Sequence, residues 1–206
     1  MTNISINTHV ECSDGSCGKS TQVIFNPVNH KVTHLVVEDR HLPDSHTRLV
    51  PVGKVASVTQ EKITLNCTKV EVEKMPSFII KHFVQESHPG KAYQSRDSYT
   101  YQYVVNDTGY DEFKEENIPD GELALYPGMH IKSKDDDKVG KLDELVLDPE
   151  SGDITHLLMR EGHLWGKKDV AIPVSEVEFC DADTIYLKLD KATIEALPTV
   201  AVKKSE

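Results

Sequence analysis

The sequence predicts an all-β protein made of two small β-barrels related by internal duplication, and two observations carry this prediction. Residues 11–76 align with residues 133–198 at a constant offset of 122 positions and without a gap, with 17 identities among the 66 aligned pairs. Within each copy, short apolar or alternating runs are separated by turn-forming residues, which is the pattern of short antiparallel strands. An offset that holds across loops as well as strands indicates that the whole unit folds the same way twice.

The second copy shows the expected elements most clearly. Gly140 opens an apolar strand, and residues 148–153 form a tight turn, because Pro149 fixes φ and Gly152 accepts a positive φ. Pro198 stops a short C-terminal helix. We expect strands at 129–133, 141–147, 154–159, 170–173 and 184–189, a single turn at 174–177 and the helix at 192–197.

The first copy repeats this plan with a hairpin turn at 26–31 that lacks glycine. Each copy should therefore close five or six short strands into a small barrel, which removes exposed sheet edges. Domains of this size bury little core, so each is expected to pack on its twin, on the linker or on a second chain. The predicted organisation is a first domain at 1–76, an ordered linker at 77–128 and a second domain at 129–206.

The second copy carries a set of turn and core residues that resembles the PRC-barrel domain. This family is named for the cytoplasmic domain of the H subunit of bacterial photosynthetic reaction centres, and a version forms the C-terminal half of a bacterial ribosome maturation factor. Residues 10–76 resemble the family more loosely, with Asn26 in place of the turn aspartate and His30 in place of its glycine. The residues that match in the second copy are Gly140, Lys141, Asp148, Pro149, Gly152, Thr155, Pro173 and Val174.

The resemblance implies a fold and no activity, because the residues that the family shares belong to turns and cores. The tandem arrangement, with its loop of His163, Leu164, Trp165 and Gly166, is similar to a group of bacterial proteins with two such domains. No function follows from that similarity.

The linker has no copy of itself. Residues 77–85 are apolar enough for a helical turn or a strand, and Tyr99, Tyr101 and Tyr103 alternate with polar residues as in a strand. Two interpretations are open. Either the linker drapes over the barrels and its aromatic side chains complete their cores, or the tyrosines form an exposed strip that binds a partner.

Charge and hydropathy exclude several classes of function. The net charge is −11 and no basic cluster is present, so direct binding of nucleic acid or of anionic lipid is not expected. No apolar run approaches the length of a membrane span, and residues 1–10 lack the features of a signal peptide. A cytoplasmic location is therefore predicted.

The cysteines give no structural zinc signature, because Cys12 and Cys17 form a single pair and Cys67 and Cys180 stand apart. Reduced thiols are expected, as is usual in a cytosolic protein. A redox pair of Cys12 and Cys17 is the alternative.

No motif indicates an enzyme, a metal site or a cofactor site. The repeated histidines, at 34 and 156 and at 41 and 163, invite a metal interpretation, but no carboxylate or cysteine recurs with them. Asp135–Asp137 lacks the closing glutamate of a calcium loop, and Gly15–Ser20 has the wrong spacing for a phosphate loop. We therefore predict no catalytic residue, no metal ligand and no cofactor.

The remaining expectation is a non-enzymatic protein-binding or scaffold protein. Trp165 is the only tryptophan, and such a loop residue either packs on its own domain or acts as a binding hot spot. The candidate partner-binding residues are His163, Trp165, Lys167, Tyr99, Tyr101 and Tyr103.

The alternatives are a ribosome or RNA-processing accessory factor and a peripheral accessory of a photosynthetic or other membrane complex, both by resemblance to proteins that contain the same domain. The predicted partner is a protein that the sequence does not identify, and a homo-oligomer is the alternative.

Overall fold

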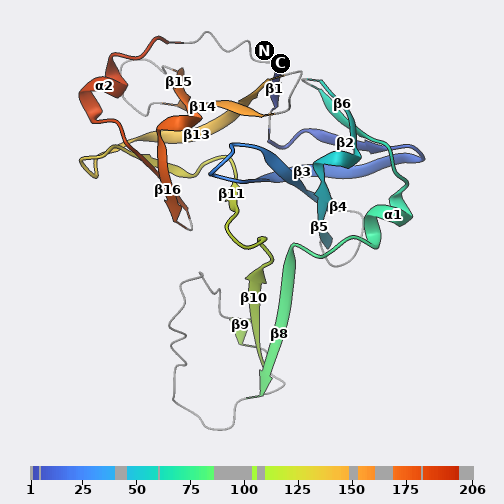
Figure 1. Ribbon diagram of the computed structural model, residues 1–206. Helices are drawn as coiled ribbons and strands as arrows, with labels where there is room; N and C mark the ends of the chain where they lie inside the picture. Colours follow the sequence, from blue (N-terminus) through green and yellow to red (C-terminus); the bar gives the residue numbers. More distant parts are fainter. Residues whose placement is uncertain are drawn as a thin grey trace.

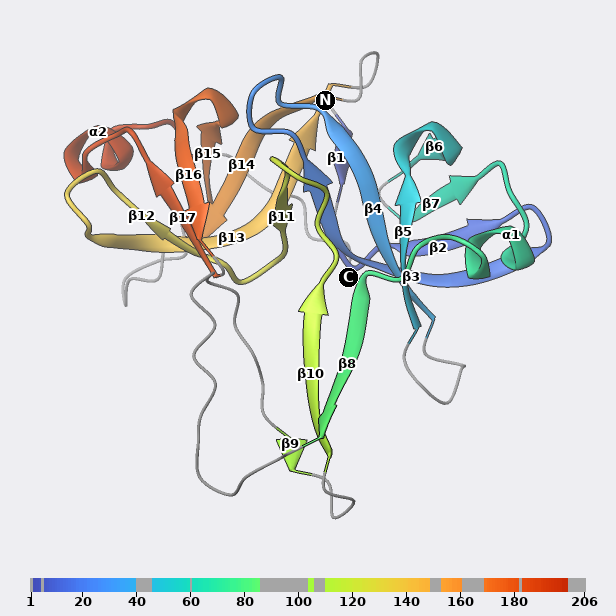
Figure 2. The same ribbon diagram turned by 60° about the horizontal axis from the view of Figure 1, so that its bottom comes forward.

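The computed structural model describes residues 2–4, 6–39, 46–59, 61–85, 104–105, 110–148, 153–160, 169–181 and 183–199. This part of the chain is mostly β-structure and forms two curled seven-stranded sheets and a separate three-stranded sheet, which confirms the predicted mainly-β fold class (Figure 1). Figure 2 shows the two sheets side by side, with a narrow arm of strands projecting away from them.

The first sheet, here called barrel 1, runs in the order β5-β4-β3-β2-β7-β6. Neighbouring strands are antiparallel except for β2 and β7, which are parallel. Its elements are β2 (His9–Cys12), β3 (Gly15–Phe25), β4 (Val32–Asp39), β5 (His46–Pro51), the 3-10 turn η1 (Val52–Lys54), β6 (Val55–Val58), β7 (Lys62–Leu65) and α1 (Lys69–Glu73).

The second sheet, here called barrel 2, has the equivalent order β15-β14-β13-β12-β17-β16. The short helix that ends each unit lies at the outer side of its barrel (Figure 2). The elements of barrel 2 are β12 (His130–Lys132), β13 (Lys138–Leu147), β14 (Ile154–Arg160), β15 (Asp169–Pro173), η2 (Val174–Glu176), β16 (Val177–Asp181), β17 (Thr184–Leu187) and α2 (Lys191–Glu195).

The offset of 122 holds for the structure from β3 onward, but not for the first strand of each barrel. In barrel 1, His9 pairs with Lys62, and in barrel 2, His130 pairs with Thr184. The second residues of these pairs differ by 184 − 62 = 122, whereas the histidines differ by 130 − 9 = 121. The gapless alignment is therefore wrong over its first few positions, because the turn after the first strand is one residue longer in barrel 2.

Each barrel also receives a strand from the other half of the chain. Strand β1 (Thr2–Ile4) precedes barrel 1 but pairs with residues 145–147 of β13, in barrel 2. Strand β11 (Leu123–Leu125) precedes barrel 2 but pairs with residues 23–25 of β3, in barrel 1. Each of the long strands β3 and β13 thus pairs along one edge with two short strands. One of the two comes from the same barrel, and the other is donated by the other half of the chain.

The two barrels share one hydrophobic cluster as a result of this exchange. Leu125 of the donated strand and Ile6, which follows β1, are 1% and 2% exposed and belong to the cluster that contains the cores of both barrels. At the centre, Lys31 forms an antiparallel bridge with Asp153, which is its own counterpart at an offset of 122. This bridge marks a pseudo-two-fold axis between the barrels, and each barrel packs on its twin as expected.

Closure of the barrels is incomplete. The hydrogen-bonded order ends at β5 and β6 in barrel 1 and at β15 and β16 in barrel 2, and a 3-10 turn joins the end strands. Bridges from Ser77 to Arg48 and from Thr199 to Val170 lie beside β5 and β15. Strands β6 and β16 have no second strand partner among the described residues, so one edge of each remains open.

The linker forms the arm. Its strands are β8 (Ile79–Gln85), β9 (Val104–Val105) and β10 (Tyr110–Glu116), in the order β8-β10-β9. At its base, Phe78 is 1% exposed and packs with Ile24, Val36 and Leu49 of barrel 1. The ends of the linker therefore pack on the barrel, as one interpretation held, while the arm projects away from it (Figures 1 and 2).

In the part of the chain that the structure describes, no helix has the length and hydropathy that crossing a membrane requires. Helices α1 and α2 have five residues each.

Candidate protein-binding surface

The six residues predicted to bind a partner lie outside the described residues. They are His163, Trp165, Lys167, Tyr99, Tyr101 and Tyr103. His41, of the second repeated histidine pair, also lies outside them. Their roles stay predictions, and the candidate surface in the described part of the chain consists of other residues.

The repeated Thr-His pair has a structural role at an irregular point of the sheet. Thr33 Oγ1 lies 3.3 Å from the carbonyl oxygen of Ile24, and Thr155 Oγ1 donates to that of Val146 at 3.1 Å. In both barrels the strand register shifts directly after this acceptor residue. The threonine hydroxyl therefore satisfies a carbonyl next to a β-bulge, which explains why the residue recurs.

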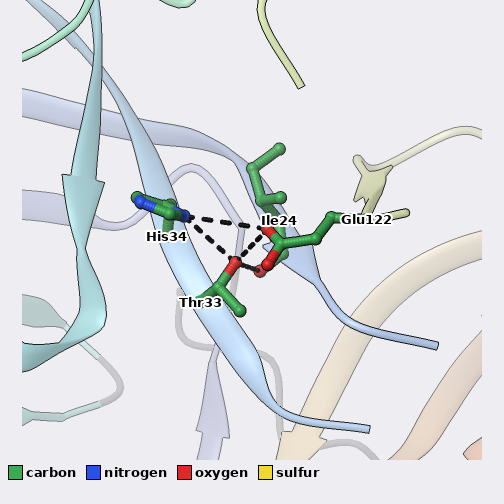
Figure 3. Close-up of polar contacts among 4 residues, drawn as sticks. All are labelled: Ile24, Thr33, His34 and Glu122. Carbon is green, nitrogen blue, oxygen red and sulfur yellow. Dashed lines mark hydrogen bonds and ion pairs between the residues drawn. The ribbon is translucent and has the colours of Figure 1, made fainter. Parts of the chain in front are cut away.

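In barrel 1 this threonine also contacts the segment that leads into the donated strand (Figure 3). Glu122 Oε2 lies 2.5 Å from Thr33 Oγ1 and 3.8 Å from His34 Nδ1, and His34 Nδ1 lies 3.0 Å from Thr33 Oγ1. Glu122 precedes β11, so these polar contacts hold the donated strand against β4. They join this linker segment to barrel 1, and one carboxylate and one imidazole meet there.

The three aspartates at 135–137 form a charged turn. Asp136 has φ 64 and its carboxylate lies 2.6 Å from Lys132 Nζ, while Asp137 lies 3.9 Å from Lys191 Nζ. Their neighbours are thus lysines instead of further acidic ligands. Among the residues that the structure describes, no group of three or more His, Cys, Asp or Glu side chains is placed to hold a metal.

The cysteine expectation is wrong for one pair, because Cys12 and Cys17 form a disulfide. The other two are free thiols. Burial, and after it the charge of Glu71, raises the pKa of the Cys67 thiol, and burial raises the pKa of Cys180 to about 12. Both therefore stay protonated and unreactive at neutral pH.

Barrel 2 carries an aromatic row across three neighbouring strands. Phe179 on β16 is paired with Tyr186 on β17, and Tyr186 is paired with Lys132 on β12. The Phe179 and Tyr186 rings are stacked, with centroids 4.3 Å apart and an interplanar angle of 13°. Lys132 Nζ lies 5.4 Å from the centroid of the Tyr186 ring, within the range of a cation–π contact.

The row ends at an open strand edge. Phe179 is 50% exposed, and the other exposed large apolar side chains that the structure describes are aliphatic and lie apart from it. Phe179 belongs to β16, whose outer edge has no strand partner in the described part of the chain. The exposed ring thus lies on a strand whose outer edge pairs with no strand of the described residues.

Barrel 1 has polar residues at the equivalent positions. Glu11, Thr64 and Ser57 form the corresponding row on β2, β7 and β6. Glu11 there accepts a hydrogen bond from Lys62 at 2.5 Å, and this contact lowers the pKa of the Glu11 carboxyl. The aromatic row therefore belongs to one copy only, and the shared fold does not require it.

Acidic residues occur next to the residues of the aromatic row in the sequence and in its neighbouring turns. Glu178 and Asp183 are exposed, and Asp136 pairs with Lys132. The hydrogen bond to Asp136 raises the pKa of Lys132, and the charge of Asp183 acts in the same direction. The aromatic row thus contains one lysine, Lys132, whose charge is paired with Asp136, beside the exposed residues Glu178 and Asp183.

Sequence reasoning missed this surface, although a signal was present. In β17 the side chains of Ile185 and Leu187 are fully buried, so Tyr186 between them must face outward. Phe179 follows the 3-10 turn in a strand that the sequence did not delimit. Only the pairing of β16 with β17 shows that the two rings meet.

Fold and surface together define a class of protein: an all-β chain with two barrels that exchange strands, in which one barrel presents an aromatic row at an open edge. Residues 128–194 match the model of the PRC-barrel domain. This match covers barrel 2 and supports the resemblance predicted for the second copy. The comparison with curated proteins found no match.

Proposed function

We propose that the chain is a non-enzymatic scaffold protein that binds an extended, basic segment of a protein partner along β16. The single observation that carries the proposal is the half-exposed Phe179, which stacks on Tyr186 at a strand edge that pairs with no described strand. The equivalent positions of barrel 1 carry no aromatic residue. An extended segment can add to such an edge through backbone hydrogen bonds, while one of its side chains packs on the exposed ring. Aromatic residues are the usual hot spots of such contacts.

Charge selects the kind of segment. Glu178 is exposed on the edge strand, Asp183 lies in the turn before β17, and the whole chain carries a net charge of −11. A basic segment would be attracted to this surface and an acidic one repelled. An arginine side chain would suit the site best, because its planar guanidinium stacks on aromatic rings.

The proposal includes an origin for barrel 1. We infer that residues 1–76 are a diverged copy of the PRC-like module, which is supported by the shared strand order and by the offset of 122 from β3 onward. On this basis barrel 1 positions and stabilises barrel 2, and the partner-binding function belongs to barrel 2.

A peptide-binding experiment tests the proposal. A library of eight-residue peptides would be panned on the wild-type protein and on Phe179→Ser, a change that introduces the serine found at the equivalent position in barrel 1. We expect the wild type to enrich basic, strand-forming peptides. Fluorescence anisotropy should show that Phe179→Ser weakens their binding by about tenfold or more, as loss of a hot-spot contact of about 1.4 kcal/mol would.

The matched control is Val28→Ser, which removes an apolar side chain that is 87% exposed in a turn of barrel 1. This variant should bind like the wild type. In addition, the amide resonances of residues 178–181 should shift most when the peptide is added. Enrichment of acidic peptides, no enrichment, or equal binding by Phe179→Ser would refute the proposal.

A further inference from the structure

The disulfide lies at a contact between the first hairpin and helix α1. Cys12 ends β2 and Cys17 lies in β3, so the bond closes the turn between these strands. Within that turn, the Ser13 backbone N–H and hydroxyl donate to the Cys67 carbonyl oxygen at 3.0 and 3.2 Å. The Lys69 N–H donates to Asp14 Oδ1 at 2.9 Å. The disulfide-closed turn thus holds the first residues of α1.

Barrel 2 makes the equivalent contact without a covalent link. There the Lys134 N–H donates to the carbonyl oxygen of Leu189 at 2.8 Å, as Ser13 does to Cys67. Helix α2 begins after Asp190, which accepts a hydrogen bond from the Thr193 N–H at 2.7 Å. Val139 stands at the position of Cys17. The fold therefore does not depend on a disulfide here, and the bond is an addition specific to barrel 1.

One of the two sulfur-bearing residues is reached by a pocket. Cys17 lines a pocket of about 30 Å³ together with the charged residues Asp39, Arg48, Lys69 and Glu73, whereas Cys12 does not line it. The Arg48 guanidinium is held in place by the carbonyl oxygens of Glu73 and Thr47, at 3.0 and 3.3 Å. The cavity accommodates a group of the size of a sulfhydryl, and its mixed charges suit a small zwitterionic thiol.

The two remaining cysteines are not suited to exchange. Cys67 and Cys180 keep their protons for the reasons given above, whereas burial alone does not separate the cysteines, since Cys12, Cys17 and Cys67 are 3%, 4% and 2% exposed. Neither of them lines the pocket. Within the described residues, Cys17 is therefore the one cysteine that lines this pocket.

We propose that Cys12–Cys17 is a reversible thiol–disulfide site that exchanges with a low-molecular-weight thiol of the glutathione type through Cys17. The thiolate of the small thiol attacks Cys17 Sγ, forms a mixed disulfide and breaks the bond to Cys12 Sγ, which leaves as a thiolate and takes a proton from water. A second small thiolate then attacks the sulfur of the small molecule in the mixed disulfide and releases Cys17 as a thiolate. Two small thiols are thereby oxidised to one disulfide, and the protein disulfide is reduced to two thiols.

Reduction loosens the turn that holds α1. The hydrogen bonds from Ser13 and to Asp14 remain available, but the covalent constraint on their backbone is lost. Helix α1 carries Val72, which is 6% exposed and belongs to the shared core. Thiol–disulfide exchange at Cys12–Cys17 thus regulates the local stability of barrel 1, whereas barrel 2 has no equivalent disulfide.

The test uses the folded full-length protein. It would be incubated with reduced glutathione, alkylated rapidly, and mapped by peptide mass spectrometry. We expect Cys12 and Cys17 to be alkylated while Cys67 and Cys180 stay protected. Labelling of Cys12 and Cys17 only together with Cys67, as global unfolding would produce, overturns the proposal, and so does the absence of labelling.

Single variants identify the attacked sulfur. Cys12→Ser and Cys17→Ser would each be incubated with oxidised glutathione, and formation of the mixed disulfide followed by mass. We expect Cys17 in Cys12→Ser to react faster than Cys12 in Cys17→Ser, on the order of tenfold, because only Cys17 lines the pocket. Equal rates, or a faster Cys12, would overturn the assignment to Cys17.

Hydrogen exchange separates a local effect from a global one. On reduction of the wild-type protein, amides at 13–16 and 67–72 should exchange faster, while those at 134–137 and 189–194 in barrel 2 keep their rates. Faster exchange in both barrels would contradict a local regulatory bond.

Discussion

Gly18 and Gly140 occupy equivalent positions at an offset of 122, and the structure shows why both are glycines. Gly18 has φ +117, and a Cβ atom there would collide with the backbone carbonyl group of Glu38. A Cβ atom on Gly140 would lie 2.6 Å from Met159 Cγ and 2.7 Å from the carbonyl oxygen of Arg160. The next strand approaches too closely in both barrels, and at Gly18 the backbone conformation also disfavours other residues.

Gly18→Ala should therefore destabilise the protein strongly. The added methyl group meets backbone that cannot move aside, and the left-handed conformation adds strain, so the free energy of unfolding should fall by about 2 kcal/mol or more. Urea denaturation measures this. Gly53→Ala is the matched control, because a Cβ atom there meets no atom within 4 Å. A loss in Gly18→Ala no larger than in Gly53→Ala would contradict this explanation.

At the scale of elements, the strands of the repeat could be predicted from the sequence, whereas the exchange of β1 and β11 could not. Alternating residues, the turn at 148–153 and Pro198 delimit barrel 2 to within a few positions of the observed bounds. Strands β1 and β11 have three residues each, too few to show a period, and their partners are more than 90 residues away in the sequence. No feature of these short segments shows whether each pairs with the barrel next to it in the sequence or with the other barrel.

The aromatic row was missed, and the pairing of Cys12 with Cys17 was only the alternative interpretation, for related reasons. Tyr186 is visibly outward-facing in the sequence, but its stacking on Phe179 depends on the register between two strands. The two cysteines are close in sequence, but only the turn of β2 and β3 brings them to a Cα–Cα distance of 5.8 Å. The six residues that the sequence predicted to bind a partner lie outside the described residues, so that prediction is untested.

Removal of β1 directly tests the exchange of strands between the two barrels. A variant without residues 1–4 leaves residues 145–147 of β13 without a partner on one side. Hydrogen exchange should therefore quicken at 145–147, while residues 23–25 of β3, which β11 covers, keep their protection. A variant without residues 203–206 serves as a control of equal length. Unchanged exchange at 145–147 would show that β1 contributes little to barrel 2.

At the scale of the whole molecule, the donated strands make each half incomplete alone. Barrel 1 contains β11 from the second half, barrel 2 contains β1 from the first, and one hydrophobic cluster runs through both. The arm adds a further link, since β8 pairs with β10 over seven residue pairs. We therefore expect the two barrels to fold and unfold as one cooperative unit.

Cutting the chain in the arm should leave this unit assembled. Fragments 1–95 and 96–206, expressed together, are expected to co-purify and to elute as a one-to-one complex in size-exclusion chromatography with light scattering. Each fragment expressed alone should aggregate or pair with itself, because its donated strand and its acceptor strand both lack partners. Two fragments that elute separately as folded monomers would show that the barrels are independent.

The bridge between Lys31 and Asp153 shows what joining two copies in one polypeptide permits. In a symmetric pair of separate, identical subunits, a side chain on the two-fold axis meets itself, so any charge there faces its own sign. Tandem copies evolve independently at that position, and here one side has become basic and the other acidic. Having both copies in one polypeptide thus lets the two sides of this backbone bridge carry residues of opposite charge, an option closed to a homodimer of identical subunits.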